Sequence, residues 1–261
     1  FRVQGTGYRK KNQETLHPTP FTLYPLFHTD ALQALPFFDV RVTMVGIDLA
    51  TISGHKVYGP KGIGALYVRQ ELRVKGIGYR VDKELSHLQF TSLNPVPCTL
   101  HPLLTGGGQE RGMRSGTENV AAIVGFAAAA ELIAQRRGRA CVRITALRDR
   151  LWRGIKSAWP KAAVNGAALR SAERLPGNLN VFLPGFQAQD LLVRLDMAGV
   201  AASAGSACAA YRLEPSRTVA QLGWGAARAG GSIRFSLGYP TTADDIDRAL
   251  ARIKKVLKTH S

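Results

Sequence analysis

The residues best suited to chemistry lie in one short segment in which Lys56 follows Ser53 and His55 and is bracketed by glycines. A lysine amine forms a Schiff base with an aldehyde when burial and neighbouring cations keep part of it neutral. Asp30 places a carboxylate at the end of an earlier predicted strand. Pyridoxal phosphate needs both a lysine for its aldehyde and a carboxylate for its pyridine nitrogen. The pair favours this cofactor over the alternative, an exposed turn with a solvated lysine.

A single cysteine is the second candidate for a reactive group. Cys208 lies within 201–210, a stretch of alanine, serine and glycine without a bulky apolar side chain. Such a loop can move, which suits a thiol that acts as a nucleophile. The alternative is a small core residue, the commonest role of a free cysteine. Cys98 and Cys141 have no such context, and the absence of paired spacing favours a reducing, cytoplasmic compartment.

The elements that position these residues are predicted from hydrophobic patterning. An apolar pair leads into the polar residues 28–30, which predicts a strand ending in functional groups, and 31–34 is helix-like. Further strands are predicted at 45–52, 63–68, 179–183 and 233–236, and helices at 119–137, 139–159, 190–197 and 244–257. Alternating helices and strands favour an α/β architecture.

The charge of the chain is unusually positive. Its 261 residues include 35 lysines and arginines but 18 acidic residues, a formal charge of +17, whereas the 45% hydrophobic content is that of a globular protein. Much of the excess lies at 9–11, 136–153 and 254–258, and the arginines of the middle segment are predicted to form a solvated cationic face. The uncharged run 120–130 is too short to cross a bilayer, and no secretory signal is expected.

Five blocks of the sequence are similar, in the same order, to the NifS/IscS-type cysteine desulfurases, which are class-V aminotransferase-like enzymes. The blocks are 28–33 (HTDALQ), 53–62 (SGHKVYGPKG), 106–119 (GGGQERGMRSGTEN), 205–208 (GSAC) and 232–238 (SIRFSLG). The resemblance implies the α/β fold of type I pyridoxal phosphate enzymes. Residues 1–138 would form a partial large domain with a mixed, mostly parallel sheet, and 139–261 a smaller carboxyl-terminal α/β domain that carries the cysteine loop.

The resemblance implies a role in cofactor binding for most of the polar residues in the first three blocks. Lys56 would bind pyridoxal 5'-phosphate through its amine, and Asp30 would pair with the pyridine nitrogen. The other residues implied to bind the cofactor are Gln33 at the ring hydroxyl, Ser53 and His55 at the phosphate, Thr117 at the phosphate of a neighbouring subunit, and Asn12. Thr117 therefore implies a homodimer, and His55 joins Lys56 and Cys208 in the implied catalytic set.

The resemblance also implies the reaction. Arg234 would bind the carboxylate of L-cysteine, because its planar fork of donors suits that group. Cys208 would take the sulfur as a persulfide, leaving L-alanine, and pass it to a sulfur acceptor such as an iron-sulfur scaffold protein. No specific nucleic acid and no membrane are expected among the partners. One alternative is a selenocysteine lyase or another class-V enzyme, although block 205–208 argues against the lyase.

Two departures from the family pattern bear on activity. The family's first strands, its phosphate-binding Gly-Thr pair and its ring-stacking histidine have no counterpart in this sequence, and Asn12 is closer to Asp30 than the family spacing requires. Residues 75–97 form an atypical insertion, in which the Lys-Gly-Ile-Gly of 61–64 recurs at 75–78. These departures support a further alternative, an inactive truncated homologue that uses its basic surface to bind acidic partners.

Overall fold

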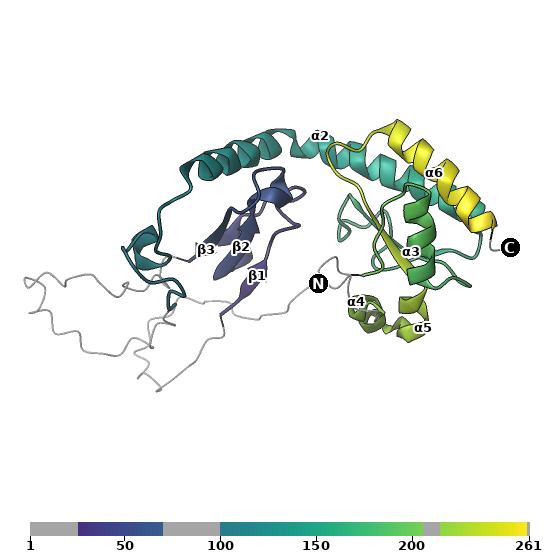
Figure 1. Ribbon diagram of the computed structural model, residues 1–261, viewed down its shortest axis with the longest axis horizontal. Coiled ribbons are helices and arrows are strands. Elements are labelled where there is room, and N and C mark those ends of the chain that lie inside the picture. Colours follow the sequence, from purple (N-terminus) through teal and green to yellow (C-terminus); the bar gives the residue numbers. More distant parts are fainter. Residues whose placement is uncertain (1–25, 70–99, 206–214, 260–261) are drawn as a thin grey trace, which may run out of the picture. The chain divides into compact units, whose positions relative to one another are not determined.

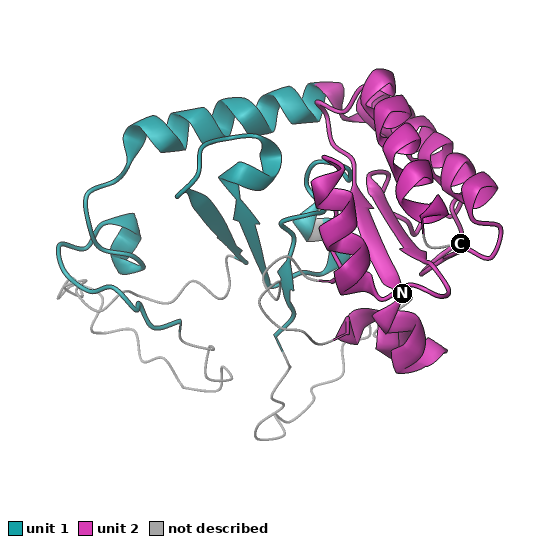
Figure 2. Ribbon diagram, turned by 45° about the vertical axis from the view of Figure 1, so that its right-hand side comes forward, with its two compact units in different colours: residues 1–135 teal, residues 136–261 magenta. Residues whose placement is uncertain are grey.

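The computed structural model describes residues 26–69, 100–205 and 215–259 and is shown in Figure 1. It divides the chain into two compact units, Phe1–Gln135 and Arg136–Ser261 (Figure 2). Asn12, Cys98, Cys208 and the predicted insertion 75–97 lie outside the described residues. Each unit has its own three-stranded sheet in the described part of the chain.

The sheet of the first unit has three strands in the order β1 (His28–Asp30), β2 (Leu49–Ser53) and β3 (Gly64–Val68). Strand β1 runs parallel to β2, with Asp30 opposite Thr51, and β2 runs antiparallel to β3. A small apolar cluster that includes Ala31, Ile47 and Ala50 packs at this sheet. The sheet is mixed, as predicted, but of its two described pairings only one is parallel.

Two local predictions in this unit are wrong. Residues 45–52 do not form one strand, because helix α1 (Val42–Val45) ends at Gly46, whose φ of 68° closes the helix in the left-handed region that glycine favours. Residues 31–34 form turns and not a helix, with Ala34 N donating to Ala31 O at 3.0 Å. Pro36 explains this difference, since proline has no N–H for a helical hydrogen bond and disfavours helical backbone before it.

Asp48 ties the three strands together at the end of the sheet opposite Asp30. Its side chain is 8% exposed, and Oδ2 accepts a hydrogen bond from Phe27 N at 2.7 Å. Oδ1 forms an ion pair with Arg69 at 2.7 Å, and the Asp48 carbonyl accepts from Arg69 N at 2.8 Å. Asp48 thus holds the entry of β1 and the exit of β3 against β2, which fixes the register at the far edge.

The sheet of the second unit is antiparallel throughout its described strands. Its order is β4 (Ala163–Val164), β5 (Asn178–Phe182) and β6 (Ser232–Ser236). The side chains of Leu179, Val181 and Ile233 are fully buried, and helix α3 (Ala188–Met197) packs against β6 and against α6 (Ala243–Lys258). Because strand side chains alternate between faces, the neighbouring polar residues of β5 and β6 occupy the other face.

The short helices α4 (Arg217–Val219), η6 (Ala220–Trp224) and α5 (Gly225–Gly230) follow one another in this unit. They were not predicted, and Gly223 at φ 86° and Gly225 at φ 77° break them into pieces too short for a helical hydrophobic period. The predicted helices 119–137 and 139–159 form one helix, α2 (Val120–Ala158). Gly138 does not interrupt it, since one glycine in a helix costs only about 1 kcal/mol.

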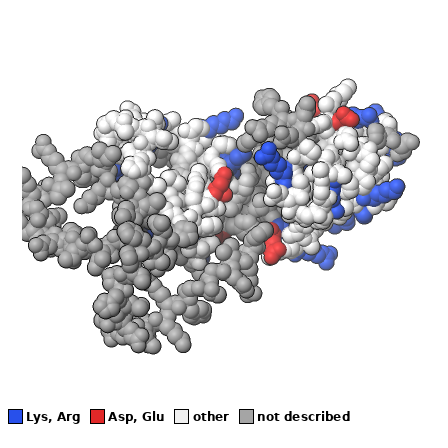
Figure 3. Space-filling view, turned by 90° about the horizontal axis from the view of Figure 1, so that it is seen from below, with Lys and Arg blue, Asp and Glu red and all other residues white. Residues whose placement is uncertain are grey.

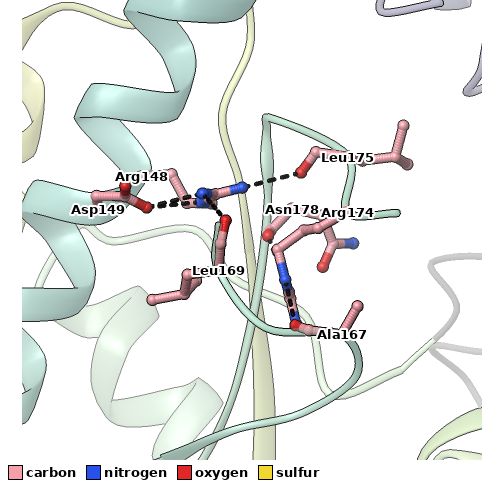
Figure 4. A network of polar contacts seen from close by, with 7 residues as sticks. All are labelled: Arg148, Asp149, Ala167, Leu169, Arg174, Leu175 and Asn178. Carbon is pink, nitrogen blue, oxygen red and sulfur yellow. Dashed lines mark hydrogen bonds and ion pairs between the residues drawn. The ribbon is translucent and has the colours of Figure 1, made fainter. Parts of the chain in front are cut away.

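Most arginines of α2 are exposed, in agreement with the predicted solvated cationic face, but Arg148 is buried. Arg148 is 1% exposed and donates to Asp149 Oδ1 at 2.8 Å and Leu169 O at 2.6 Å (Figure 4). Arg143 donates to the carbonyls of Tyr239 and Thr241, and Arg150 pairs with Asp247. Figure 3 shows lysines and arginines at several separate places on one face of the molecule. Loop carbonyls, Asp149 of the same helix and Asp247 of α6 take up part of the charge.

Helix α6 begins with a reciprocal cap that makes stability depend on pH. Asp245 N donates to Thr242 Oγ1 at 3.1 Å, and Asp245 Oδ2 accepts from Thr242 N at 2.9 Å. The hydrogen bonds from the Thr242 side chain and backbone, and then from Arg248, lower the pKa of Asp245 to about 2. The stabilisation is therefore complete above the ordinary value of 3.8 and is lost as pH falls toward about 2.

We expect Asp245→Asn to remove this acid dependence. Thermal unfolding midpoints, measured from neutral pH down to about pH 2, should fall less steeply in the variant than in the wild type below about pH 4. Asp244→Asn is the matched control, because Asp244 contacts Arg248 at 3.0 Å but does not join the cap. Parallel profiles for Asp245→Asn and the wild type would contradict the assignment.

Candidate active site

The first group of predicted site residues meets at one edge of the first unit's sheet. Asp30 is the last residue of β1 and Ser53 the last residue of β2, and the next turn, η1 (Gly54–Val57), carries His55 and Lys56. Because β1 and β2 are parallel, their carboxyl ends lie at the same edge, where α/β sheets bind their ligands. The structure thus brings the predicted lysine and carboxylate to one place.

The turn that carries Lys56 has a backbone geometry that requires glycine. A Cβ on Gly54 would lie 2.6 Å from Ile63 Cγ2 and 2.8 Å from Pro60 O, both too close. Gly54 N donates to Ile63 O, and Gly59 N donates to Gly54 O, each at 2.9 Å. Val57 is 1% exposed while Lys56 is exposed. The buried valine therefore anchors the turn and leaves the lysine amine on the surface of the unit.

The polar side chains at this edge are partly paired with one another. Ser53 Oγ and His55 Nδ1 lie 2.8 Å apart in a hydrogen bond. One Asp30 oxygen, Oδ1, accepts from Leu32 N at 3.0 Å, and the Lys56 amine has no acceptor among the described residues. Since an amine, a carboxylate oxygen, a hydroxyl and an imidazole remain close together, this donor set fits pyridoxal phosphate.

Two predicted cofactor residues are not joined to this group. Gln33 and Thr117 are exposed, and neither forms a hydrogen bond with the residues at the strand ends in the described part of the chain. Thr117 follows the glycine loop 106–108, which closes partly on itself: Gly108 N donates to Ser115 Oγ at 3.3 Å and Gly116 N to Gln109 Oε1 at 3.0 Å. These donors are therefore already used within the loop.

The second group of site residues lies in the other unit, around a pocket of about 350 Å³. Arg234 lines it and is half-buried, and its backbone is fixed by exchange of hydrogen bonds with Ser203 at 2.7 and 3.0 Å. The guanidinium has no acceptor among the described residues, so its donors are available to an anion. Gly205 and Ser216 also line the pocket, so the chain borders it immediately before and shortly after the segment that contains Cys208.

The charge around this pocket favours an anionic ligand. Arg174 and Arg234 line it together with one acid, Glu173. Burial, followed by the charge of Arg148, lowers the pKa of Arg174, but a guanidinium stays protonated in proteins. Arg174 donates to the carbonyls of Asn165 and Ala167, so it holds the pocket wall and contributes charge, while Arg234 keeps its donors for the ligand.

Sequence reasoning missed three residues of this pocket, Asn165, Arg174 and Asn180. A usable signal existed for one of them, because the run Asn178-Leu179-Asn180-Val181 alternates polar and apolar residues, which marks a strand with one polar face. Nothing in the local sequence of Asn165 or Arg174 distinguishes them from surface loop residues.

Among the described residues, no group of three or more acidic, histidine or cysteine side chains is placed to hold a metal ion. In the same part of the chain, no helix has the length and apolar character needed to cross a membrane.

Comparison with known proteins identifies the class of protein. The chain is similar to solved NifS-like structures that have the α/β fold of type I pyridoxal phosphate enzymes, which confirms the predicted fold class. Residues 24–249 match the family model "Aminotransferase class-V", and the chain belongs to this family. Enzymes of the family depend on pyridoxal phosphate.

Individual relatives narrow the similarity. The cysteine desulfurase IscS of Clostridium botulinum is 39% identical over 232 residues, 89% of this chain and 52% of the relative. A NifS-like protein from Rickettsia africae matches with a TM-score of 0.69 and 27% identity over 89% of this chain and 54% of its own. The structure of SspA in complex with cysteine matches with a TM-score of 0.53 and 29% identity over 81% and 50%. The chain thus spans about half the length of these relatives.

Proposed function

We propose that the protein acts as a pyridoxal phosphate-dependent cysteine desulfurase, which converts L-cysteine to L-alanine and keeps the sulfur as a persulfide on Cys208. The meeting of Lys56 and Asp30 at one sheet edge carries this proposal, because the cofactor needs both groups. The names of the relatives support the reaction, and the bound cysteine in SspA supports the substrate. Arg234, whose guanidinium has no acceptor among the described residues, would supply a site for the substrate carboxylate.

The cofactor, when bound, supplies an electron sink for bonds broken at the substrate. Lys56 Nζ would hold it by the aldehyde, and the Asp30 carboxylate would keep a proton at its pyridine nitrogen. Ser53 and His55 would bind the phosphate, and their mutual hydrogen bond orients both side chains. Gln33 would reach the ring hydroxyl, and Asn12 would contribute a further polar contact.

In the second unit, Arg234 would fix the substrate by its carboxylate. The Cys208 thiolate would then attack the substrate sulfur: an S–S bond forms, the C–S bond breaks, and its electron pair stays with the carbon, which takes up a proton to become the methyl group of alanine. Gly205 and Ser216, which lie on either side of the Cys208 segment in the sequence, line the Arg234 pocket, which supports this role for the cysteine.

Further parts of the proposal concern assembly and partners. Thr117 is exposed just before α2, which suits a contact with the cofactor phosphate of a second subunit in a homodimer. The persulfide would be passed to a sulfur acceptor in iron-sulfur cluster assembly or another sulfur-transfer route, as the IscS names of the relatives suggest. We also propose a cytoplasmic location, where thiols stay reduced.

The test uses the purified chain with added pyridoxal phosphate. We expect an absorbance band of a lysine-bound cofactor and, with L-cysteine and a thiol reductant, release of alanine and sulfide. Lys56→Ala should abolish the band and the products, whereas Lys61→Ala should keep both, because Lys61 is an exposed lysine outside the η1 turn. A band that survives Lys56→Ala would refute the assignment. Absence of products from the wild type would favour an inactive homologue.

A further inference from the structure

Asn180 shares a polar face of the second sheet with Arg234. The two residues are direct partners in the antiparallel register of β5 and β6, so their side chains leave the sheet on the same side and close to each other. Both are half-buried and both line the 350 Å³ pocket. An amide side chain therefore lies beside the guanidinium that the proposed function assigns to the substrate carboxylate.

The direction of the Asn180 amide is fixed by a neighbouring hydrogen-bond ring, which begins at Arg228. Arg228 Nε donates to Asn165 Oδ1 at 2.7 Å. A guanidinium has only donors, so the oxygen of the Asn165 amide must face Arg228 and its nitrogen must face the other way. This nitrogen then donates to Ser232 Oγ at 2.8 Å and to Asn180 Oδ1 at 2.6 Å.

Ser232 closes the ring, because its Oγ donates to the Arg228 carbonyl at 2.6 Å while it accepts from Asn165. Both hydrogens of the Asn165 amide and the hydrogen of the Ser232 hydroxyl are then donated, and each has one defined acceptor. The ring leaves one outgoing bond, from Asn165 to Asn180 Oδ1, and this bond determines which end of the Asn180 amide turns away from the ring.

The ring is held rigidly by its surroundings. Asn165 is 3% and Ser232 is 1% exposed. The Arg228 guanidinium lies 3.8 Å from the centre of the Trp224 ring and 5.5 Å from that of Phe182, a favourable arrangement of cation and aromatic faces, and it also donates to Val164 O at 3.0 Å. If the Asn165 amide were turned round, its NH2 group would face the Arg228 guanidinium, and two donors would meet. The orientation of the Asn180 amide is therefore fixed.

We propose that Asn180 Nδ2 is a second donor to the carboxylate of the substrate, beside Arg234, and that Asn165 and Arg228 are positioning residues that set its direction. Asn180 Oδ1 is occupied by Asn165, whereas Nδ2 has no acceptor among the described residues and belongs to a residue that lines the pocket. The identity of the ligand rests on the proposed function, whereas the direction of the Asn180 donor rests only on the hydrogen bonds of the ring.

Steady-state kinetics of the enzyme with pyridoxal phosphate test the donor. A hydrogen bond to a charged group contributes about 1.5–3 kcal/mol, so Asn180→Ala should raise KM for L-cysteine roughly 10- to 150-fold with little change in kcat. Asn180→Asp, which has the same shape but presents an anionic oxygen, should raise KM further. An unchanged KM in both variants, with a wild type that makes alanine, would overturn the inference and leave the proposed function standing.

Asn165→Asp separates positioning from a structural role. It keeps an oxygen for Arg228 and adds a second one toward Asn180, so the Asn180 amide should reverse and turn its oxygen to the pocket. We expect a raised KM at near wild-type unfolding free energy. Asn178→Asp controls for the added negative charge alone, because Asn178 lines the same pocket but forms no side-chain hydrogen bond with the ring, and it should raise KM less than Asn165→Asp does. A fully folded Asn165→Asp enzyme with wild-type KM would refute the positioning role.

A binding measurement without cofactor distinguishes failure of this inference from failure of the proposed function. In nuclear magnetic resonance spectra of the protein without pyridoxal phosphate, the Asn180 side-chain NH2 signals should shift when L-alanine is added, and less so in Arg234→Gln. If the wild type makes no alanine from cysteine but these signals shift, the reaction is wrong and the carboxylate donor is right. Absence of a shift while Arg234 signals respond to the ligand would refute the donor.

Discussion

Arg234→Gln is expected to lower kcat/KM for L-cysteine by roughly 10²- to 10⁴-fold. The estimate takes two charge-assisted hydrogen bonds between the guanidinium and the substrate carboxylate, each contributing about 1.5–3 kcal/mol, and converts their sum at about 1.4 kcal/mol per tenfold change. The guanidinium has no competing acceptor among the described residues, so its loss is not offset by the release of an internal contact. Steady-state kinetics with alanine as the measured product give the ratio directly.

Two further variants test whether the loss of kcat/KM comes from the planar fork of donors or from the positive charge alone. Arg234→Lys keeps the charge but not the planar fork, so it should retain an intermediate kcat/KM. Arg194→Gln removes an exposed arginine from α3 in the same unit and should leave kcat/KM unchanged, which excludes a general effect of net charge. Equal losses for Arg194→Gln and Arg234→Gln would contradict a specific carboxylate site.

Arg148→Met is expected to lower the free energy of unfolding of the second unit by about 2–5 kcal/mol, the cost of removing a buried guanidinium from two carbonyls and from a carboxylate that is 25% exposed. Methionine keeps the apolar part of the side chain, but it leaves Asp149 without its cation and the carbonyls of Leu169 and Leu175 without a donor. Such a loss is a large part of the total stability of a typical domain. Urea unfolding monitored by the circular dichroism of the helices measures it.

Arg150→Met provides the matched control two positions along the same helix. Arg150 forms an ion pair with Asp247 at 2.6 Å, but its side chain is 47% and that of Asp247 is 49% exposed. Exposed pairs contribute at most about 1 kcal/mol, so this variant should unfold at nearly the wild-type urea concentration. If both variants lose the same stability, the burial of Arg148 does not determine its contribution.

The hydrophobic pattern of the sequence was sufficient to predict the strand ends that carry the candidate site residues. Asp30 closes a strand as predicted, and Ser53 closes β2 one residue after the predicted strand end, because short apolar runs stop where polar residues begin, and this is a local property. The helix 244–257 was predicted within two residues of α6 for the same reason, since its apolar residues repeat with the helical period. Similarity of ordered motifs then identified the family, which hydrophobic periodicity alone does not define.

The residues that were missed depend on partners far away in the chain. Asp48 is an ordinary acid in the sequence, and only the return of Arg69 to its side makes it an anchor of the sheet. Arg148 looks like the other arginines of α2 until the carbonyls of Leu169 and Leu175 enclose it. Asn165 bonds to Ser232, 67 positions later. Such contacts are set by tertiary packing, to which the local sequence gives no guide.

The ring of Arg228, Asn165 and Ser232 also allows the local opening of the second unit's sheet to be measured. Both amide hydrogens of Asn165 are held in hydrogen bonds, one to Ser232 within the ring and one to Asn180 outside it, so they exchange with solvent deuterium only when these bonds open. Their exchange rate therefore measures the local opening of the sheet at this point. A ligand bound to Asn180 in the pocket would slow that exchange, so occupancy of the pocket and the local opening equilibrium of the strand are thermodynamically linked.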